Sequence, residues 1–453
     1  MSYSPHLRTA VLLSGSGTGG AYHAGVLRAL HEAGIKIDVV SGRGIGVVCA
    51  LFAAIDAGAK TWEDGGVWRR RPAARIYHWR APLQFAAIFV LAAIAVLAVP
   101  LLVVATALLI YPLSFLVQMV SVDSGARLAT AYADMVRSAF APQVLPTIVP
   151  RLVTLCLAVA FLVLAVTAIR TRPDITSGKG NRDRGRWWAR IIGALWTTEP
   201  GLRSVRASLW HLFRGPAAAK EPSAADLSRR YTELLFENLG QPGFRELIIA
   251  TLDVETRGDL VFAAISEARR QTFFQRSRGD LIDLSGVGRS QVLDALAASL
   301  CVPVLTEPHL LAFSPESYWK GETHRICDRV GAVARLLEEI AAAGVDQVII
   351  VCPDSDRSAP HRLSKPTGSL RSRLAEHLSA AETTVVRDAV TSYKKRFKGL
   401  FVIQPLHNPI GPFDFDGSYD ERSDRYQGLD ELIDRGYEDA YRQFVEPIVG
   451  GSE

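Results

Sequence analysis

The sequence predicts an α/β protein with a mainly parallel sheet, interrupted by a pair of membrane-spanning helices. Three observations lead to this prediction. Two strand–turn–helix patterns follow one another near the N-terminus, strands alternate with helical patterns from about residue 226 onward, and a charge-free apolar run extends from Leu83 to Val120. Alternating strands and helices are typical of layered α/β folds, whereas a charge-free run of this length is typical of membrane spans.

The composition agrees with this division. The chain has 453 residues, of which 49% are hydrophobic and 21% are charged, so its apolar residues are concentrated in particular segments. Its five cysteines are widely spaced, which fits a reduced compartment and carries no metal-ligand signal. The N-terminal apolar run is too short for a secretory signal. We expect no metal, no cofactor and no nucleic-acid partner.

Two segments are predicted to cross a membrane. The first is Leu83–Val120 and the second is Leu152–Ile169, which is bounded by Arg151 and Arg170. A crossing needs about 20 helical residues, so the first run is longer than one simple span requires. Pro100 and Pro112 can kink or end it, and the pattern leaves open one long kinked helix or a span followed by a re-entrant or interfacial segment.

The charges that flank these segments predict their orientation. Arginines are frequent between residues 69 and 80 and basic residues again between 170 and 190, while the loop of roughly residues 121–146 carries two acidic and two basic residues. By the positive-inside rule, both ends of the chain face the cytoplasm. We expect a multi-pass protein with two spans, of the bacterial inner-membrane type.

The chain is therefore divided into four parts. Residues 1–80 and 226–453 are expected to form one domain that ends in a C-terminal helix, residues 81–170 a transmembrane hairpin inserted into it, and residues 171–225 a basic linker. Within the linker, Leu202, Val205, Leu209 and Leu212 recur at helical spacing. This pattern fits equally an interfacial helix on anionic lipid and an amphipathic helix packed on the domain.

A glycine-rich turn follows the first predicted strand and has two interpretations. Gly15, Gly17 and Gly20 are spaced as in a dinucleotide-binding turn, which requires an acidic residue at the end of the second strand. The nearby candidate, Asp38, begins its strand instead. Alternatively, the glycines present backbone N–H groups as an oxyanion hole toward a nucleophile on the next turn.

The second turn, Gly42–Gly46, has the arrangement of a nucleophile elbow. The expected pattern is G-x-S-x-G, in which the serine is displayed on a strained turn. Here Gly44 occupies the serine position, between Arg43 and Ile45. Glycine adopts the backbone conformation of such a turn without steric cost but offers no nucleophile.

These residues resemble the patatin-like phospholipase family. Its members combine an oxyanion loop of the form G-G-G-x-R/K-G, a G-x-S-x-G elbow, and an Asp in a D-G-G or D-G-A motif. The resemblance covers roughly residues 7–65 and 226–410. It implies a three-layer fold and hydrolysis of lipid acyl esters by a Ser–Asp dyad. Carried over, the nucleophile position is Gly44, the dyad position is Asp328, the oxyanion loop is Gly15, Ser16, Gly17, Thr18, Gly19 and Gly20, and the elbow comprises Gly42, Arg43, Ile45 and Gly46.

Three departures from the family pattern bear on activity. Gly44 replaces the serine, Arg329 and Val330 follow Asp328 where small residues are expected, and Gly19 stands where Arg or Lys is usual. The interpretation is a membrane-anchored family member that is weak or inactive at the usual site. The alternatives are a non-catalytic lipid-binding or assembly module and, less favoured, a nucleotide-binding protein. We expect membrane phospholipid or lysophospholipid as its partner, and homo-oligomerisation is left open.

Several other residues are weighed and given lesser roles. The candidates for a substitute nucleophile are Ser14, Ser16, Ser41 and Cys49. His23 and His31 lie on the first predicted helix and are expected to be solvated or capping side chains. The pair Asp416–Gly417 is interpreted as a turn and not as the dyad motif.

Overall fold

A computed structural model of the chain describes residues 3–17, 19–69, 76–170, 194–215, 220–276, 279–353, 370–405, 418–420 and 425–449. The chain divides into two compact units. The first consists of Met1–His78 together with Trp196–Glu453, and the second of Trp79–Leu195. Thr18, the basic segment 171–193 and the pair Asp416–Gly417 lie outside the described residues.

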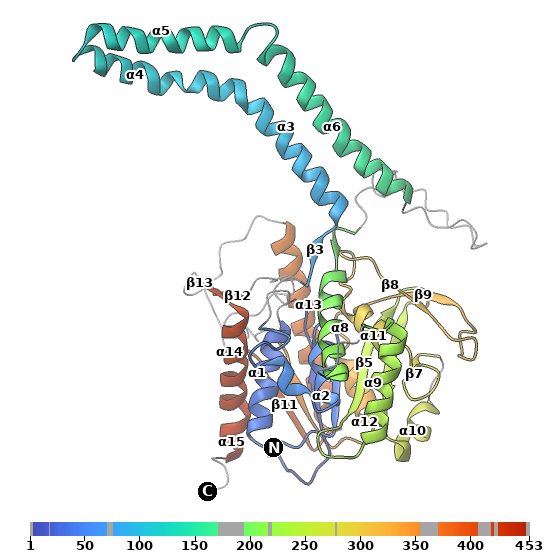
Figure 1. Cartoon of the computed structure of the whole chain (residues 1–453). Helices are drawn as coiled ribbons and strands as arrows, with labels where there is room; N and C mark the ends of the chain where they lie inside the picture. The colour runs from blue at the N-terminus through green and yellow to red at the C-terminus, as the bar shows by residue number, and fades with distance from the viewer. Residues whose placement is uncertain are drawn as a thin grey trace. The chain divides into compact units, whose positions relative to one another are not determined.

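The first unit is built on a nine-stranded sheet among the described residues (Figure 1). Its main path runs β11-β10-β1-β2-β5-β6-β7, and β9 joins β5 to β8. The pairs from β11 to β5 are parallel, β6 runs antiparallel to β5, and β9 pairs antiparallel with both β5 and β8. The strands are β1 (Thr9–Leu13), β2 (Val39–Gly42), β5 (Glu246–Asp253), β6 (Gly258–Ala264), β7 (Leu281–Asp283), β8 (His309–Ala312), β9 (Thr323–Cys327), β10 (Gln347–Val351) and β11 (Gly399–Ile403).

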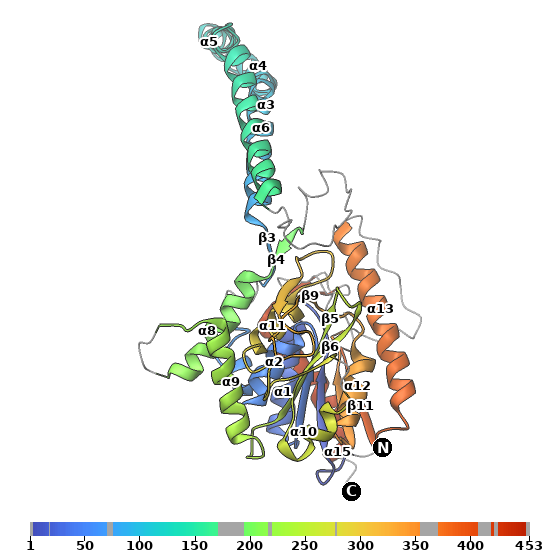
Figure 2. The same cartoon turned by 90° about the vertical axis from the view of Figure 1, so that its right-hand side faces the viewer.

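Helices cover both faces of this sheet, which gives the predicted three-layer α/β fold. All five side chains of β1 are buried, as expected for a parallel strand covered on both faces. The helices are α1 (Gly19–Glu32), α2 (Gly46–Ala54), α8 (Glu199–Arg214), α9 (Ala224–Asn238), α10 (Glu267–Phe274), α11 (Val292–Leu300), α12 (Val333–Ala342), α13 (Leu370–Tyr393), α14 (Leu429–Ala440) and α15 (Glu446–Val449), with a 3₁₀ turn at Gly58–Thr61 and a π-helical turn at Tyr441–Val445. In Figure 2, α12 and α13 lie on one side of the strands, and α8 and α9 on the other.

Helix α8 is the amphipathic segment for which two interpretations were open. Its apolar residues Val205 and Leu209 are 4% and 1% exposed, and the helix contacts α11 of the sheet's helical layer. It is therefore a packed helix of the first unit.

The described part of the second unit is mainly helical. It contains α3 (Ala81–Ala105), α4 (Ala107–Gln118), α5 (Val122–Ala139) and α6 (Leu145–Arg170). Helices α3 and α6 lie side by side, as do α4 and α5 (Figure 1). By length and composition, Ala81–Gln118 and Leu145–Ile169 are sufficient to cross a membrane. The segment 121–146, expected to be a loop, is largely the helix α5.

Among the described residues, two pairs of short strands and three isolated bridges lie outside the main sheet. β3 (His78–Trp79) pairs with β4 (Trp196–Thr197), and β12 (Ser418–Asp420) pairs with β13 (Arg425–Gln427). An isolated bridge joins Ile55 to Phe244 beside the end of α2.

Candidate active site

The glycine-rich loop and the elbow lie at the carboxyl ends of two adjacent parallel strands. Leu13 at the end of β1 pairs in register with Gly42 at the end of β2. The Arg43 N–H then donates to the Leu13 carbonyl at 3.1 Å, and α2 begins at Gly46. This edge of a parallel sheet is where α/β proteins place their ligands.

At the elbow, Gly44 has the positive φ of 55° that a nucleophile position requires, but its side-chain space is already filled. A Cβ atom there would lie 2.2 Å from the Gly15 carbonyl oxygen. That same oxygen accepts a hydrogen bond of 2.9 Å from the Ile45 N–H. In hydrolases with this elbow, the N–H after the nucleophile forms part of the oxyanion hole. Here the Gly15 carbonyl occupies the space of the nucleophile's side chain and also accepts the hydrogen bond of the Ile45 N–H.

Other N–H groups of the loop are also engaged. The Gly19 N–H donates to the Ser16 carbonyl at 3.2 Å. The backbone of Gly17 hydrogen-bonds the Tyr77 hydroxyl, a buried group whose pKa is raised by burial and by the nearby Asp328 carboxylate. An oxyanion hole requires donors aimed at an open position. Gly17 and Gly19 instead hydrogen-bond partners within the fold.

Asp328 follows β9 and lies beside the elbow. Its N–H donates to the Cys301 carbonyl at 2.8 Å, and one carboxylate oxygen lies 3.4 Å from the position of a Cβ on Gly44. The side chain is buried, and burial raises its pKa to about 6. The Arg43 guanidinium opposes this rise, whereas the Glu382 carboxylate adds to it.

Arg43 is the residue whose role the sequence did not reveal. Its side chain is 0% exposed, with Nη2 at 2.9 Å from Glu382 Oε2 and Nη1 at 3.6 Å from Asp328 Oδ2. Nη2 also lies 3.5 Å from Ser16 Oγ, and the Ser14 hydroxyl donates to Glu382 at 2.6 Å. We call Arg43, Asp328 and Glu382 the ionic cluster. One buried cation thus serves two buried carboxylates.

The substitute nucleophiles are all engaged in the fold. Ser14 and Ser16 bind the ionic cluster as described, and the Ser41 hydroxyl lies 3.4 Å from the Val11 carbonyl. Cys49 contacts the Trp68 indole N–H, and burial raises its pKa to about 12, which keeps the thiol protonated at neutral pH.

The two histidines of α1 differ from each other. His23 is completely buried, against the expectation of a solvated side chain, and its Nε2 lies 3.0 Å from the Ser14 carbonyl. Burial lowers its pKa to about 4, so the ring is neutral and braces the start of the glycine-rich loop. His31 is exposed.

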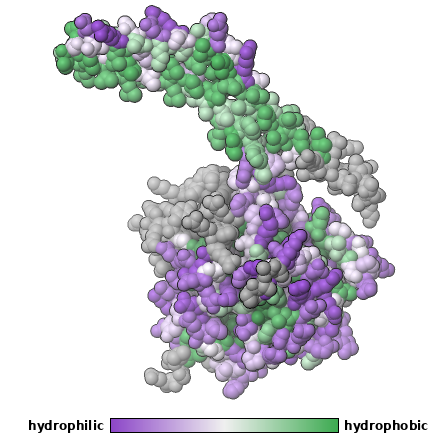
Figure 3. All heavy atoms as spheres, in the orientation of Figure 1, coloured by the Kyte–Doolittle hydropathy of each residue, from purple (hydrophilic) through white to green (hydrophobic). Residues whose placement is uncertain are grey.

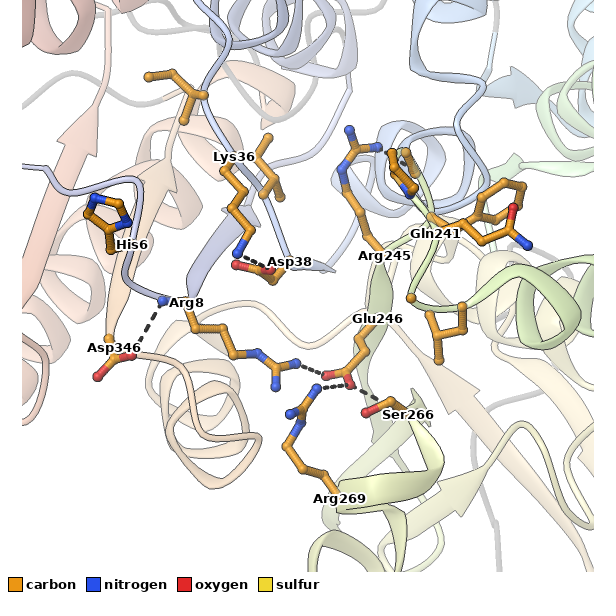
Figure 4. Close-up of a pocket in the computed structure, with 17 residues that line it drawn as sticks. His6, Arg8, Lys36, Asp38, Gln241, Arg245, Glu246, Ser266, Arg269 and Asp346 are labelled. Carbon is orange, nitrogen blue, oxygen red and sulfur yellow. Dashed lines mark hydrogen bonds and ion pairs between the residues drawn. The ribbon is translucent and has the colours of Figure 1, made fainter.

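The dinucleotide interpretation requires an acidic group beside the glycine-rich loop. Asp38 lies instead before β2, at the opposite end of the strand from the elbow, where it accepts from the Thr9 N–H and pairs with Lys36 at 3.1 Å. It lines a cavity of about 670 Å³ (Figure 4). Two arginines that line the cavity are paired within the protein: Arg8 and Arg269 both form ion pairs with Glu246. This geometry does not place a carboxylate where a ribose would be bound.

The raised pKa of Asp328 predicts a pH effect on stability. The folded protein holds a proton on this carboxyl between about pH 4 and 6 that the unfolded chain releases, so its contribution to the free energy of unfolding falls as pH rises through that window. Asp328→Asn should remove the dependence and raise stability at pH 7, relative to wild type, by up to about 3 kcal/mol. Thermal unfolding in detergent at several pH values measures this.

A matched control is Asp64→Asn, because the Asp64 side chain is 99% exposed. It should leave the pH profile unchanged. If Asp328→Asn changes the stability as little as Asp64→Asn does at every pH, the Asp328 carboxylate is not held in an unfavourable buried state.

A three-layer α/β domain with a glycine-rich loop beside a strand–turn–helix elbow has the architecture of hydrolase folds. The comparisons name the family. The model of the patatin-like phospholipase family matches residues 11–328, and the chain belongs to that family. Among the relatives, patatin-like phospholipase domain-containing protein 6 of Mus musculus is 39% identical over 62 residues, which are 14% of this chain and 5% of that protein.

A patatin-like phospholipase domain-containing protein of Caenorhabditis elegans is 39% identical over 69 residues, or 13% of this chain and 5% of the relative. The chain thus matches a small part of the length of these curated relatives. The crystal structure of VipD from Legionella pneumophila aligns with a TM-score of 0.34 and 11% identity, covering 99% of this chain and 68% of that one.

Proposed function

We propose that this chain is a membrane-anchored patatin-family protein that binds membrane lipid without hydrolysing acyl esters at the usual elbow. One observation carries the proposal: the Gly15 carbonyl lies 2.2 Å from where the nucleophile's Cβ would be and accepts the Ile45 N–H. Acyl transfer needs a side-chain nucleophile and open oxyanion donors. Gly44 offers no nucleophile, and the Ile45 N–H is already bound to the Gly15 carbonyl. The family relationship supports phospholipid or lysophospholipid as the ligand class.

The ionic cluster supports the same proposal. In a Ser–Asp dyad the carboxylate must receive the proton of the serine hydroxyl. Here Asp328 shares the Arg43 guanidinium with Glu382 inside the protein. Asp328 lies close to the elbow, as the dyad assignment expects, but its environment is that of a buried structural charge.

A second candidate function rests on Ser14. Its hydroxyl donates to Glu382 at 2.6 Å, which is the pairing of a serine with a carboxylate base. Because the Ser14 side chain is 0% exposed, a substrate could reach it only after the loop opens. This candidate is a hydrolase with a relocated nucleophile, and it is the less favoured of the two.

Phospholipid turnover separates these candidates. The purified protein, reconstituted in vesicles of phosphatidylcholine or lysophosphatidylcholine, should release fatty acid no faster than the same vesicles without protein. Turnover that is lost in Ser14→Ala and retained in Ser41→Ala would establish the relocated nucleophile and end the non-catalytic proposal.

The membrane proposal places both parts of the first unit on the cytoplasmic side, because the two apolar segments make an even number of crossings. Cysteines introduced at Lys60 and Glu237, exposed residues on either side of the insertion, should be protected from an impermeant maleimide in intact cells. A cysteine at Ser124 should react. A Cys156→Ser background removes the thiol within α6. Opposite labelling of Lys60 and Glu237 would contradict two crossings.

A further inference from the structure

Helices α4 and α5 of the second unit form an antiparallel pair whose two members differ in polarity. α4 exposes apolar side chains, among them Leu109 and Phe115 at 73% and 63%. α5 packs on it through Gly125 and Tyr132, which are buried. The opposite face of α5 is polar and consists of Asp123, Arg127, Thr130, Asp134 and Arg137, all exposed. Figure 3 shows polar atoms along one edge of this pair and apolar atoms along the other.

The lengths of the helices leave this pair outside a simple crossing. The apolar segment Ala81–Gln118 has 38 residues, which at 1.5 Å per residue would extend ~57 Å against a hydrocarbon core of ~30 Å. α3 alone has 25 residues and α6 has 26, so each is already long enough to cross. A crossing that included α5 would bring its four charged side chains into hydrocarbon, at about 2.5–3.5 kcal/mol for each central charge.

A specific set of hydrogen bonds marks the break between α3 and α4. The helix is interrupted at Thr106, and the Val103 carbonyl there accepts from the Thr106 hydroxyl and from the Tyr132 hydroxyl of α5, each at 2.7 Å. In lipid, a backbone carbonyl released from its helix needs such partners. α5 thus supplies a donor that stabilises the break, and the Tyr111 ring packs edge-to-face on Tyr132.

We propose that α4 and α5 form an interfacial arm that lies along the non-cytoplasmic surface of the bilayer. α4 lies among the acyl chains of that leaflet, and the polar face of α5 contacts headgroups and water. The occupant is a phospholipid surface, because the apolar side of the arm is continuous in the chain with the span α3. Asp123 and Asp134 balance Arg127 and Arg137, so the arm does not select anionic lipid. This inference rests on the proposed membrane anchoring.

Measuring how deeply labelled residues of α3, α4 and α5 lie in the bilayer tests the interfacial arm. Single cysteines at Ile94 in α3, Leu109 in α4 and Thr130 in α5, each carrying an environment-sensitive fluorophore, are placed in the full chain in nanodiscs with Cys156→Ser. We expect the Ile94 label to be quenched by lipids spin-labelled deep in the chain, the Leu109 label by lipids spin-labelled near the headgroup, and the Thr130 label by aqueous iodide. Adding phosphatidylglycerol to phosphatidylcholine should leave all three unchanged.

The outcomes separate this inference from the anchoring proposal. If the Ile94 label is quenched by iodide, the span itself is absent and anchoring fails. If the Ile94 label lies in lipid but the Leu109 label lies in water, the arm alone is refuted and α4 projects from the membrane. If the Thr130 label is as deep as the Ile94 label, the pair crosses the bilayer, which also refutes the arm.

A further variant tests the interruption between α3 and α4 at Thr106 without removing any apolar surface. Tyr132→Phe deletes the hydroxyl that reaches Val103, and the Leu109 label should then spread over a wider range of depths. Tyr111→Phe deletes a hydroxyl from the neighbouring ring, 5.6 Å away between centroids, and leaves the Tyr132–Val103 bond in place. Equal effects of the two variants would contradict the role given to Tyr132.

Discussion

Replacing Arg43 by methionine should destabilise the first unit by about 3–5 kcal/mol, which is the cost of removing one partner from a buried ion pair. Arg43 is completely buried, and without it Glu382 and Asp328 would be left close together in the interior with no cation between them. The midpoint of chemical unfolding in detergent measures the loss.

The control for this prediction is Arg203→Met. Arg203 pairs with Glu199 at 3.5 Å on the surface, with both side chains more than half exposed, and an exposed pair of this kind contributes about 0–1 kcal/mol. Adding Glu382→Gln to Arg43→Met should recover part of the stability, because it removes one of the uncompensated charges. Equal midpoints for Arg43→Met and Arg203→Met would show that the cluster is not a structural element.

The second large effect is expected at the elbow. Gly44→Ala places a methyl group 2.2 Å from the Gly15 carbonyl oxygen, so the loop must move and the bond from the Ile45 N–H must break. The left-handed backbone adds about 1–2 kcal/mol for a residue with a Cβ, and the unsatisfied buried groups add about 1–3 kcal/mol. We expect a total loss of about 2–5 kcal/mol in unfolding free energy.

Gly65→Ala is the control that separates the steric clash with the Gly15 carbonyl from the cost of a positive φ. Gly65 has a similar positive φ of 73°, but a Cβ there meets nothing within 4 Å. Gly65→Ala should therefore lose only the unfolding free energy that the positive φ costs a residue with a Cβ. Gly44→Ser should be as destabilised as Gly44→Ala and remain without esterase turnover. A Gly44→Ser protein that is as stable as Gly65→Ala and hydrolyses esters would mean that the site lacks only its hydroxyl.

The sequence predicted the parts of this protein that follow from short, local patterns. The strand–turn–helix repeats around Gly15 and Gly44 predicted the α/β layers, and the charge-free runs predicted the two apolar helical segments. These signals depend on neighbouring residues, so they can be read without knowledge of the fold. The positive φ of Gly44 also follows from its place in an elbow.

The ionic cluster could not be predicted because its members are far apart in the chain. Glu382 reaches Arg43 across 339 positions, from a helix that carries no motif. The one local signal was Arg43 itself, a charge within an otherwise apolar and glycine-rich elbow, which indicates a buried partner without naming it. His23 was misjudged because helix α1 is buried along most of its length and packs on α14, α2 and the 3₁₀ turn, which a single amphipathic pattern does not reveal.

We propose that the elbow, filled by the Gly15 carbonyl of the protein's own backbone, does not form an acyl-enzyme. Fluorophosphonate labelling of the purified wild-type chain in nanodiscs, with mass-spectrometric mapping of adducts, tests it most directly. We expect no adduct on any residue between β1 and α2, because Gly44 offers no nucleophile and Ser14, Ser16 and Ser41 are bound within the fold. A stoichiometric adduct on Ser14 or Ser16 would contradict it.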